Sequence, residues 1–230
     1  MADPLLFDFV ADLAQRVELP EPIVEFGSLQ VKEGQPNDLR PLFAGRRFIG
    51  TDFRAGPGVD RIEDLRGLSF GAGEVGTALC LDTLEHCADP LTACREMHRV
   101  LADGGLCVIT SVMLIGIHGY PSDYWRFTPE GFRLLLADFD DVDVTGMGDP
   151  AIPQWVFGAG RKGGELGVRL AELPGLLEAQ ETFERAEGQV KVGPFRLSLR
   201  GLAGVLRDEL PRAVAQRAAA RIRSAGRSCE

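Results

Sequence analysis

Short apolar runs alternate with stretches of helical periodicity in this chain, and that alternation constrains its fold more than any other feature. Runs of strand character lie at residues 23–26, 47–53, 60–64, 77–81, 106–113, 142–145 and 154–159. Apolar residues recur at helical spacing in residues 4–16, 38–43, 89–101 and 129–137. Strands that alternate with helices in this way form parallel β-α-β units. We therefore expect an α/β fold with a doubly wound, mostly parallel sheet of seven strands.

The end of the chain departs from this alternation. The last two strand-like runs are joined by a short connection, so they can pair antiparallel at an edge of the sheet. After them, residues 163–230 read as helical or partly disordered, and residues 191–230 hold nine basic residues against three acidic ones. We expect two parts, a sheet domain at 1–162 and a C-terminal helical extension or partly disordered tail at 163–230.

Composition excludes several functional classes. The chain has 25 basic and 34 acidic residues, a formal net charge of −9, which argues against nucleic acid as the main partner. Acidic residues at positions 3, 8 and 12 leave no basic region at the start, so a signal peptide is not expected. The apolar run 106–117 is too short to span a bilayer. Five cysteines without a CxxC pair indicate reduced thiols. We expect a cytoplasmic protein with no stable membrane association.

Polar residues follow the predicted strands where each strand ends. In doubly wound sheets, ligands bind outside the carboxyl ends of the strands. Gly27 follows the first strand, and Asp52 ends the second, 25 residues later. A glycine there lets a ligand approach the backbone, and a carboxylate at the second position can accept both ribose hydroxyls. The segment EFGSLQVKEG lacks the three glycines of a pyrophosphate site. The pattern therefore favours a nucleoside without phosphates, and a nicotinamide dehydrogenase is disfavoured.

Several segments, taken in order, resemble the class I S-adenosylmethionine-dependent methyltransferases over about residues 20–160. The segments are IVEFGS, FIGTDF, DLRGLSF, LDTLEHCADPLTACREMHRVLADGGLCVIT and, for one subset of the family, HGYPSDYWRFTPEGF. The resemblance implies a Rossmann-like fold and S-adenosyl-L-methionine as cofactor. The chain departs from the family pattern at Leu29 and Val31, where further glycines are usual, and at Gly76, where an acid is usual.

The resemblance also implies roles for individual residues at the cofactor. Gly27 and Ser28 would approach it with their backbone, and Glu25 would hold its methionine end. Asp52 would bind the ribose hydroxyls, with Phe53 against the adenine. The remaining implied contacts are Asp64 with the adenine amino group, the Leu65 amide with a ring nitrogen, and the backbone of Cys80 and Leu81 along the methionine pocket. Asp60 and Glu63 lie close enough to Asp64 to take its place.

An acid-rich segment follows the fourth strand. Asp82, Glu85 and His86 could coordinate a divalent cation, with carboxylate oxygens favouring magnesium or calcium. Alternatively, Glu85 orients the loop and His86 faces the methyl acceptor. We favour the second reading and expect no metal.

An aromatic loop at residues 118–132 follows the fifth strand. It holds both tyrosines of the chain, Tyr120 and Tyr124, and one of its two tryptophans, Trp125. Aromatic faces attract a cationic methyl donor and stack on planar acceptors, and His118 or a tyrosine could orient or deprotonate a nucleophile. We expect Trp125 and Phe127 to be structural and His118, Tyr120 and Tyr124 to face the ligand.

The sequence thus favours a methyltransferase that transfers a methyl group to a small-molecule acceptor, on oxygen or nitrogen, by direct displacement. The expected catalytic residues are His118, Tyr124, Tyr120 and His86. The alternative is a non-catalytic interaction module with a methyltransferase-like fold and a degenerate cofactor loop, which Leu29, Val31 and Gly76 support. A homodimer is compatible with either reading.

Overall fold

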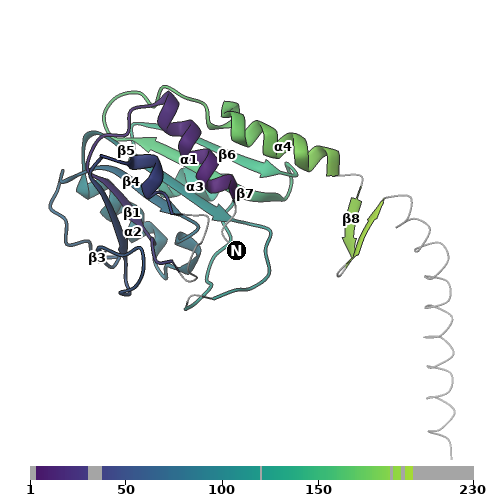
Figure 1. Cartoon of the computed structure of the whole chain (residues 1–230), viewed down its shortest axis with the longest axis horizontal. Coiled ribbons are helices and arrows are strands. Elements are labelled where there is room, and N and C mark those ends of the chain that lie inside the picture. The colour runs from purple at the N-terminus through teal and green to yellow at the C-terminus, as the bar shows by residue number, and fades with distance from the viewer. Residues whose placement is uncertain (1–3, 31–37, 120, 187–188, 193–194, 199–230) are drawn as a thin grey trace, which may run out of the picture. The chain divides into compact units, whose positions relative to one another are not determined.

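The computed structural model describes residues 4–30, 38–119, 121–186, 189–192 and 195–198. The chain divides into two units, one up to Gln180 and one from Glu181, and Figure 1 shows the sheet and helices of the first. The first unit contains the sheet and the candidate site. In the second, β8 (Gln189–Val192) and β9 (Phe195–Ser198) pair antiparallel. The expectation of helical or partly disordered structure at residues 163–230 did not include these two strands, and the Arg-rich tail after residue 198 lies outside the described residues.

Seven strands form the sheet of the first unit. They are β1 (Ile23–Phe26), β2 (Phe48–Asp52), β3 (Arg61–Ile62), β4 (Val75–Leu81), β5 (Leu101–Val112), β6 (Asp141–Gly148) and β7 (Pro153–Arg161). Their order is β3-β2-β1-β4-β5-β7-β6, with β1 to β5 parallel and β7 antiparallel to both of its neighbours. The predicted doubly wound, mostly parallel sheet of seven strands is confirmed. The antiparallel strand is β7, which lies one place in from the edge strand β6.

Helices flank the strands, and local sequence explains where two of them begin. The helices are α1 (Pro4–Arg16), α2 (Pro90–Val100), α3 (Pro129–Leu135) and α4 (Pro174–Ala186), with short 3-10 turns η1 (Arg40–Phe43), η2 (Leu84–His86) and η3 (Leu170–Glu172). Asp89 caps α2 by accepting a hydrogen bond from the Thr92 amide, 3.1 Å long, and Thr128 caps α3 in the same way from Gly131, 3.1 Å. Both caps precede a proline at the first helical position, as the sequence predicts.

The core consists of two apolar layers, one on each face of the sheet. Helices α2 and α3 cover one face with Met97, Val100 and Phe132. On the other face, α1 packs with Phe9 against Phe157 of β7, with ring centroids 4.8 Å apart. None of the helices in the described part of the chain is both long enough and apolar enough to cross a membrane.

Residues 163–176 pack with the sheet rather than apart from it. Carboxylates of β6 hold this segment: Asp141 accepts a hydrogen bond from the Leu166 amide, and Asp143 from the Leu170 amide, both 2.7 Å long. Leu166, Leu170, Leu173 and Leu176 are buried in the core layer shared with α1. The sequence assigned this segment to a C-terminal extension, whereas the compact unit runs to Gln180. A functional division after residue 162 stays a prediction.

Substitution of Phe132 measures how much the apolar layer between α3 and the sheet stabilises the fold. Its side chain is fully buried, so Phe132→Ala removes a large side chain from a packed core and should lower the free energy of unfolding by about 3–5 kcal/mol. Leu134 lies on the same helix with 65% of its surface exposed, so Leu134→Ala should change the free energy of unfolding by no more than about 0.5 kcal/mol. Urea denaturation followed by circular dichroism measures both. Equal losses in the two variants would contradict this packing.

Candidate functional site

The candidate site forms where five parallel strands end on one edge of the sheet. Their registers align these ends: Phe26 of β1 pairs with Thr51 of β2, and Leu81 of β4 with Thr110 of β5. Asp52 ends β2 beside Ile62 of β3. Residues that follow these strands are therefore brought to the same edge, where doubly wound sheets bind their ligands.

Gly27 and Ser28 form a tight turn directly after β1. Gly27 has φ +90°, a conformation that side chains disfavour, and both amides donate to the Thr51 carbonyl, at 2.8 and 2.9 Å. The Ser28 hydroxyl is buried and donates to the Gly58 carbonyl, 2.9 Å away. Since these donors are occupied, a ligand at this turn would meet Cα and carbonyl atoms rather than N–H groups.

Thr83 lies over Gly27 and limits the space there. A Cβ atom added to Gly27 would meet the Thr83 hydroxyl at 2.1 Å. This hydroxyl donates to the Leu81 carbonyl at 2.8 Å, which fixes it across the ends of β1 and β4. The glycine is therefore required by its backbone conformation and by the approach of Thr83, a contact that the sequence did not reveal.

Asp52 presents a carboxylate at the end of β2. Its side chain is 9% exposed; one oxygen, Oδ1, accepts a hydrogen bond from the Arg54 amide at 2.9 Å. The other oxygen accepts none from the residues that the structure describes. Phe53 beside it is 50% exposed, and the Arg54 guanidinium lies 4.8 Å from the centroid of its ring. Arg54 Nε is buried without a hydrogen-bond partner, 3.6 Å from Asp52 Oδ1. Sequence reasoning missed Arg54.

The acid predicted for an adenine contact is engaged elsewhere. Asp64 is exposed, and the Arg66 side chain donates to both of its oxygens, at 3.0 and 2.7 Å. Hydrogen bonds from Arg66 lower the pKa of the Asp64 carboxyl. The alternatives are structural too: Glu63 accepts from the Ser69 amide at 2.8 Å, and Asp60 accepts from Arg40 at 2.6 Å. The Leu65 amide, in contrast, donates to no described residue.

The remaining predicted cofactor residues line the inner part of the same edge. Glu25 pairs with Leu79 in the parallel sheet, and burial raises the pKa of the Glu25 carboxyl to about 8. Cys80 is fully buried, so its side chain belongs to the core, and Leu81 ends β4 with a partly exposed side chain. These backbone positions agree with the predicted pocket wall, and the contact itself stays a prediction.

Gly76, one departure from the family pattern, has a structural cause. A Cβ atom at this position would meet the Pro20 carbonyl group at 2.4 Å. The segment before β1 crosses the start of β4 there, and the Gly76 amide donates to the Pro22 carbonyl at 2.9 Å. An acidic side chain at position 76 is therefore excluded by the chain itself. Val31, another departure, lies outside the described residues.

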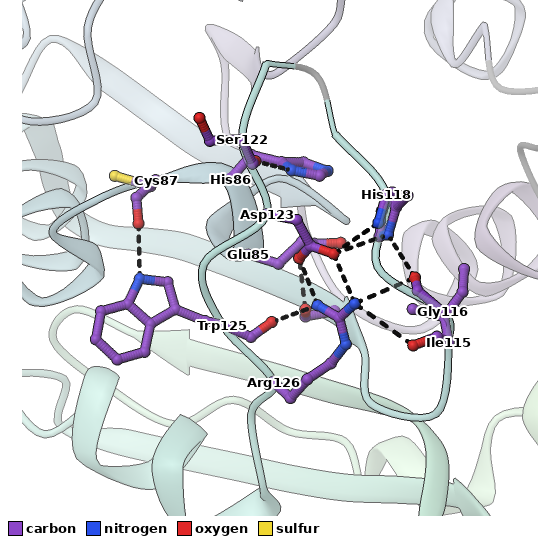
Figure 2. A network of polar contacts seen from close by, with 11 residues as sticks. Glu85, His86, Cys87, Ile115, Gly116, His118, Ser122, Asp123, Trp125 and Arg126 are labelled. Carbon is purple, nitrogen blue, oxygen red and sulfur yellow. Dashed lines mark hydrogen bonds and ion pairs between the residues drawn. The ribbon is translucent and has the colours of Figure 1, made fainter.

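The aromatic loop is docked on the turn η2. Figure 2 shows the contacts: the Trp125 indole donates to the Cys87 carbonyl at 2.9 Å, and His86 Nδ1 lies 2.6 Å from the Ser122 carbonyl oxygen. The amides of Tyr124 and Trp125 donate to the Glu85 carbonyl, at 2.8 and 3.3 Å. The backbone carbonyl of Glu85 is thus the point at which the aromatic loop contacts η2.

Within the loop, Asp123 and Arg126 form an ion pair that sequence reasoning missed. Arg126 donates to both oxygens of Asp123, at 2.5 and 2.7 Å, and also contacts the Gly116 carbonyl at 3.3 Å. The same carboxylate accepts the His118 amide at 2.9 Å. These contacts close residues 116–126 into a compact turn, and the hydrogen bonds from Arg126 hold the pKa of Asp123 well below its usual range.

The loop brings His118 next to His86. Their rings lie edge to face, with centroids 4.9 Å apart. Burial lowers the pKa of His86, which favours its neutral form. His118 Nδ1 lies 3.3 Å from Asp123 Oδ2. Two of the predicted catalytic residues are therefore neighbours in space.

The division of the other aromatic residues into buried and exposed side chains differs from the prediction. Phe127 is buried against Phe132, as expected, with ring centroids 5.4 Å apart. Trp125 was expected to be structural, yet 42% of its surface is exposed, because its indole N–H is held at the surface by the Cys87 carbonyl. Tyr124 is 54% exposed, which agrees with a ligand-facing position. Tyr120 lies outside the described residues.

Glu85 is the least expected member of this region. Its side chain is completely buried; Oε2 accepts a hydrogen bond from the Ser111 hydroxyl at 2.9 Å, and Oε1 has no partner among the described residues. Burial, followed by the nearby Asp82 carboxylate, raises the pKa of Glu85 to about 8. Asp82 is itself engaged by the Thr110 hydroxyl at 2.8 Å.

We compared the chain with protein-family models, curated proteins and solved structures. Residues 49–109 match the family model described as a methyltransferase domain, and no curated protein matches the sequence. A solved complex of the Haloferax volcanii Trm112 methyltransferase activator with a methyltransferase has TM-score 0.51 and 16% identity, over 70% of this chain and 91% of that one.

Two further solved structures are similar. The 1,6-didemethyltoxoflavin-N1-methyltransferase of Burkholderia thailandensis, with S-adenosylhomocysteine bound, has TM-score 0.49 and 19% identity over 70% of this chain and 79% of that one. A possible histamine N-methyltransferase of Thermotoga maritima has TM-score 0.46 and 22% identity over 69% of this chain and 91% of that one. At these identities the likeness concerns the fold. Residues 49–109 therefore match a methyltransferase domain, and the Haloferax volcanii structure shares the fold of this chain.

Proposed function

We propose that this protein binds S-adenosyl-L-methionine and transfers its methyl group to a small-molecule acceptor, on oxygen or nitrogen. The observation that carries the proposal is Asp52, a carboxylate at the end of β2 with one oxygen that accepts no hydrogen bond from the described residues. It lies one strand from the Gly27 turn, where nucleoside-binding sheets hold ribose hydroxyls.

The residues at this edge fit such a cofactor. Asp52 would hold the ribose, the exposed Phe53 ring would pack on the adenine, and the free Leu65 amide would meet a ring nitrogen. Asp64 is less suited to the adenine because Arg66 occupies both of its oxygens. The cofactor supplies a methyl group on a sulfonium, which is electrophilic without metal or redox chemistry. Glu25, at the end of β1, would add negative charge once the bound cation displaces its proton, which burial retains in the free protein up to about pH 8.

The acceptor side would be formed by the docked loop. His118 and His86 present two imidazoles, and neutral imidazole is the commonest general base in proteins. Tyr124 is exposed beside them and can orient an acceptor with its hydroxyl. Holding the two reactants in line supplies much of the acceleration, since well-oriented pairs gain roughly 7–11 kcal/mol. The free thiols at Cys80, Cys87, Cys94 and Cys107 support action in a reducing compartment such as the cytoplasm.

Asp52→Ala should weaken binding of S-adenosyl-L-methionine by roughly tenfold or more, because hydrogen bonds to a charged group contribute about 1.5–3 kcal/mol. Isothermal titration calorimetry measures this directly. Asp103→Ala is the control, since Asp103 is exposed in another part of the sheet. Unchanged affinity in folded Asp52→Ala would remove the ribose assignment. Absence of heat with the native protein would instead support a non-catalytic module, which the occupied Gly27 and Ser28 amides favour.

Glu25 predicts a pH dependence of cofactor binding. A positively charged ligand favours the carboxylate form, whereas in the free protein burial keeps the Glu25 proton until the pH reaches about 8. The association constant should therefore fall as the pH drops below 8, by up to about tenfold per pH unit, and should level off above it. Calorimetry with S-adenosyl-L-methionine between pH 6 and 8.5 measures the slope. Glu25→Gln should flatten it; a slope as steep in the variant would assign it to another group.

His118→Ala and Tyr124→Phe should leave cofactor affinity unchanged, because both residues lie on the acceptor side. Turnover should fall by as much as about 10²–10⁴-fold if the residue is a general base, and by less if it only orients the acceptor. A screen of phenols, catechols and amines, with formation of S-adenosylhomocysteine as the readout, supplies the substrate. Full turnover in both variants would show that the loop is only a scaffold.

A further inference from the structure

Three side chains from two segments that are distant in the sequence lie close together where the aromatic loop meets η2. Glu85 and His86 belong to η2, and His118 comes from the loop after β5. One ligating atom from each of the three lies within 4.8 Å of the other two. The whole chain contains only three histidines, and two of them meet here. Two imidazoles and a carboxylate are a ligand set that proteins use for zinc and for iron(II).

The second nitrogen of each imidazole is already positioned by the protein. His86 Nδ1 lies 2.6 Å from the Ser122 carbonyl oxygen, and His118 Nδ1 lies 3.3 Å from both the Gly116 carbonyl oxygen and Asp123 Oδ2 (Figure 2). When Nδ1–H donates to such an oxygen, Nε2 carries the lone pair. Metal-binding histidines are oriented by this arrangement, with the free nitrogen toward the ion.

One oxygen of the Glu85 carboxyl group, Oε1, is available for a ligand. Glu85 is completely buried; Ser111 donates to Oε2, while Oε1 has no hydrogen-bond partner among the described residues. A buried polar atom without a partner is uncommon and calls for an explanation. A cation beside Oε1 supplies one. The Arg126 guanidinium acts on Glu85 electrostatically, but it donates its short hydrogen bonds to Asp123, at 2.5 and 2.7 Å, and none to Oε1.

The chemistry of the ligands selects the ion. Magnesium and calcium prefer oxygen ligands, and imidazole nitrogen suits transition metals. Asp82, which the sequence placed beside Glu85 and His86 as a further ligand, is held by the Thr110 hydroxyl at 2.8 Å and by Trp155 at 3.4 Å. It is therefore less available than His118. Ligands of one zinc ion lie about 3.4 Å apart, so binding would draw the three groups together by roughly 1 Å.

We propose that Glu85, His86 and His118 together bind one divalent transition-metal ion of the zinc class. Three protein ligands leave a coordination position open, which an oxygen or nitrogen atom of an acceptor can occupy. The ion would also join the loop to η2, adding to the backbone contacts with Glu85. This inference differs from the metal-free site expected from sequence and does not depend on cofactor binding. With the ion bound, His86 and His118 act as ligands rather than as general bases.

The test uses the full chain without an affinity tag, treated with chelator and dialysed. Cobalt(II) is added as the probe and followed by its visible absorption, and zinc is then titrated by calorimetry in the absence of any methyl donor. We expect one ion per chain and no heat with magnesium. Glu85→Gln, His86→Ala and His118→Ala should each weaken binding by at least about tenfold, since even the loss of a supporting partner costs 10–100-fold.

The third histidine provides the matched control. His98 packs edge to face on Phe139, with centroids 4.9 Å apart, and lies outside the cluster, so His98→Gln should bind the probe like the native chain. Circular dichroism checks that each variant folds; should His86→Ala fail to fold, Glu85→Gln and His118→Ala still decide. Absence of binding, binding that none of the three variants weakens, or a thiolate-to-cobalt charge-transfer band that points to cysteine would each overturn the proposal.

Discussion

The parallel register of β2, β1, β4 and β5 is the constraint on which the site depends. Because these strands are parallel and their residues are paired in aligned register, their carboxyl ends lie along one edge of the sheet. Gly27, Asp52 and the turn η2 are brought to that edge by pairing alone. The strands are buried on both faces, by α1 on one and by α2 and α3 on the other. A shift of one residue would turn core side chains toward the wrong face, so packing fixes the register.

Glu85 links this edge to the loop that follows β5. Its carbonyl accepts the amides of Tyr124 and Trp125, so the loop is fixed by backbone contacts that tolerate many side chains. Its carboxyl group lies inside the same junction, held by Ser111. A buried carboxyl is destabilising unless hydrogen bonds or a cation compensate for lost hydration. Ser111 supplies one such hydrogen bond, and Oε1 receives none from the described residues.

The sequence predicted the residues whose roles depend on local chemistry. It was less complete for residues whose contacts come from distant segments. The caps Asp89 and Thr128 and the strand-end carboxylate Asp52 follow from short-range patterns, and the structure places them as expected. Asp64 illustrates the limit: its position after β3 was right, but Arg66 occupies both oxygens. Trp125 was expected inside, yet a single hydrogen bond to the Cys87 carbonyl keeps the ring at the surface.

By itself, the sequence determined the fold class, the seven strands and the edge at which a ligand would bind, because periodicity and capping act over a few residues. Only the tertiary structure decided which polar groups meet there. Spacing along the chain does not predict that His118 reaches His86, that Thr83 covers Gly27, or that Asp123 pairs with Arg126. These contacts depend on how the loop after β5 folds back onto η2. That path is set by hydrogen bonds between segments that lie far apart in the sequence.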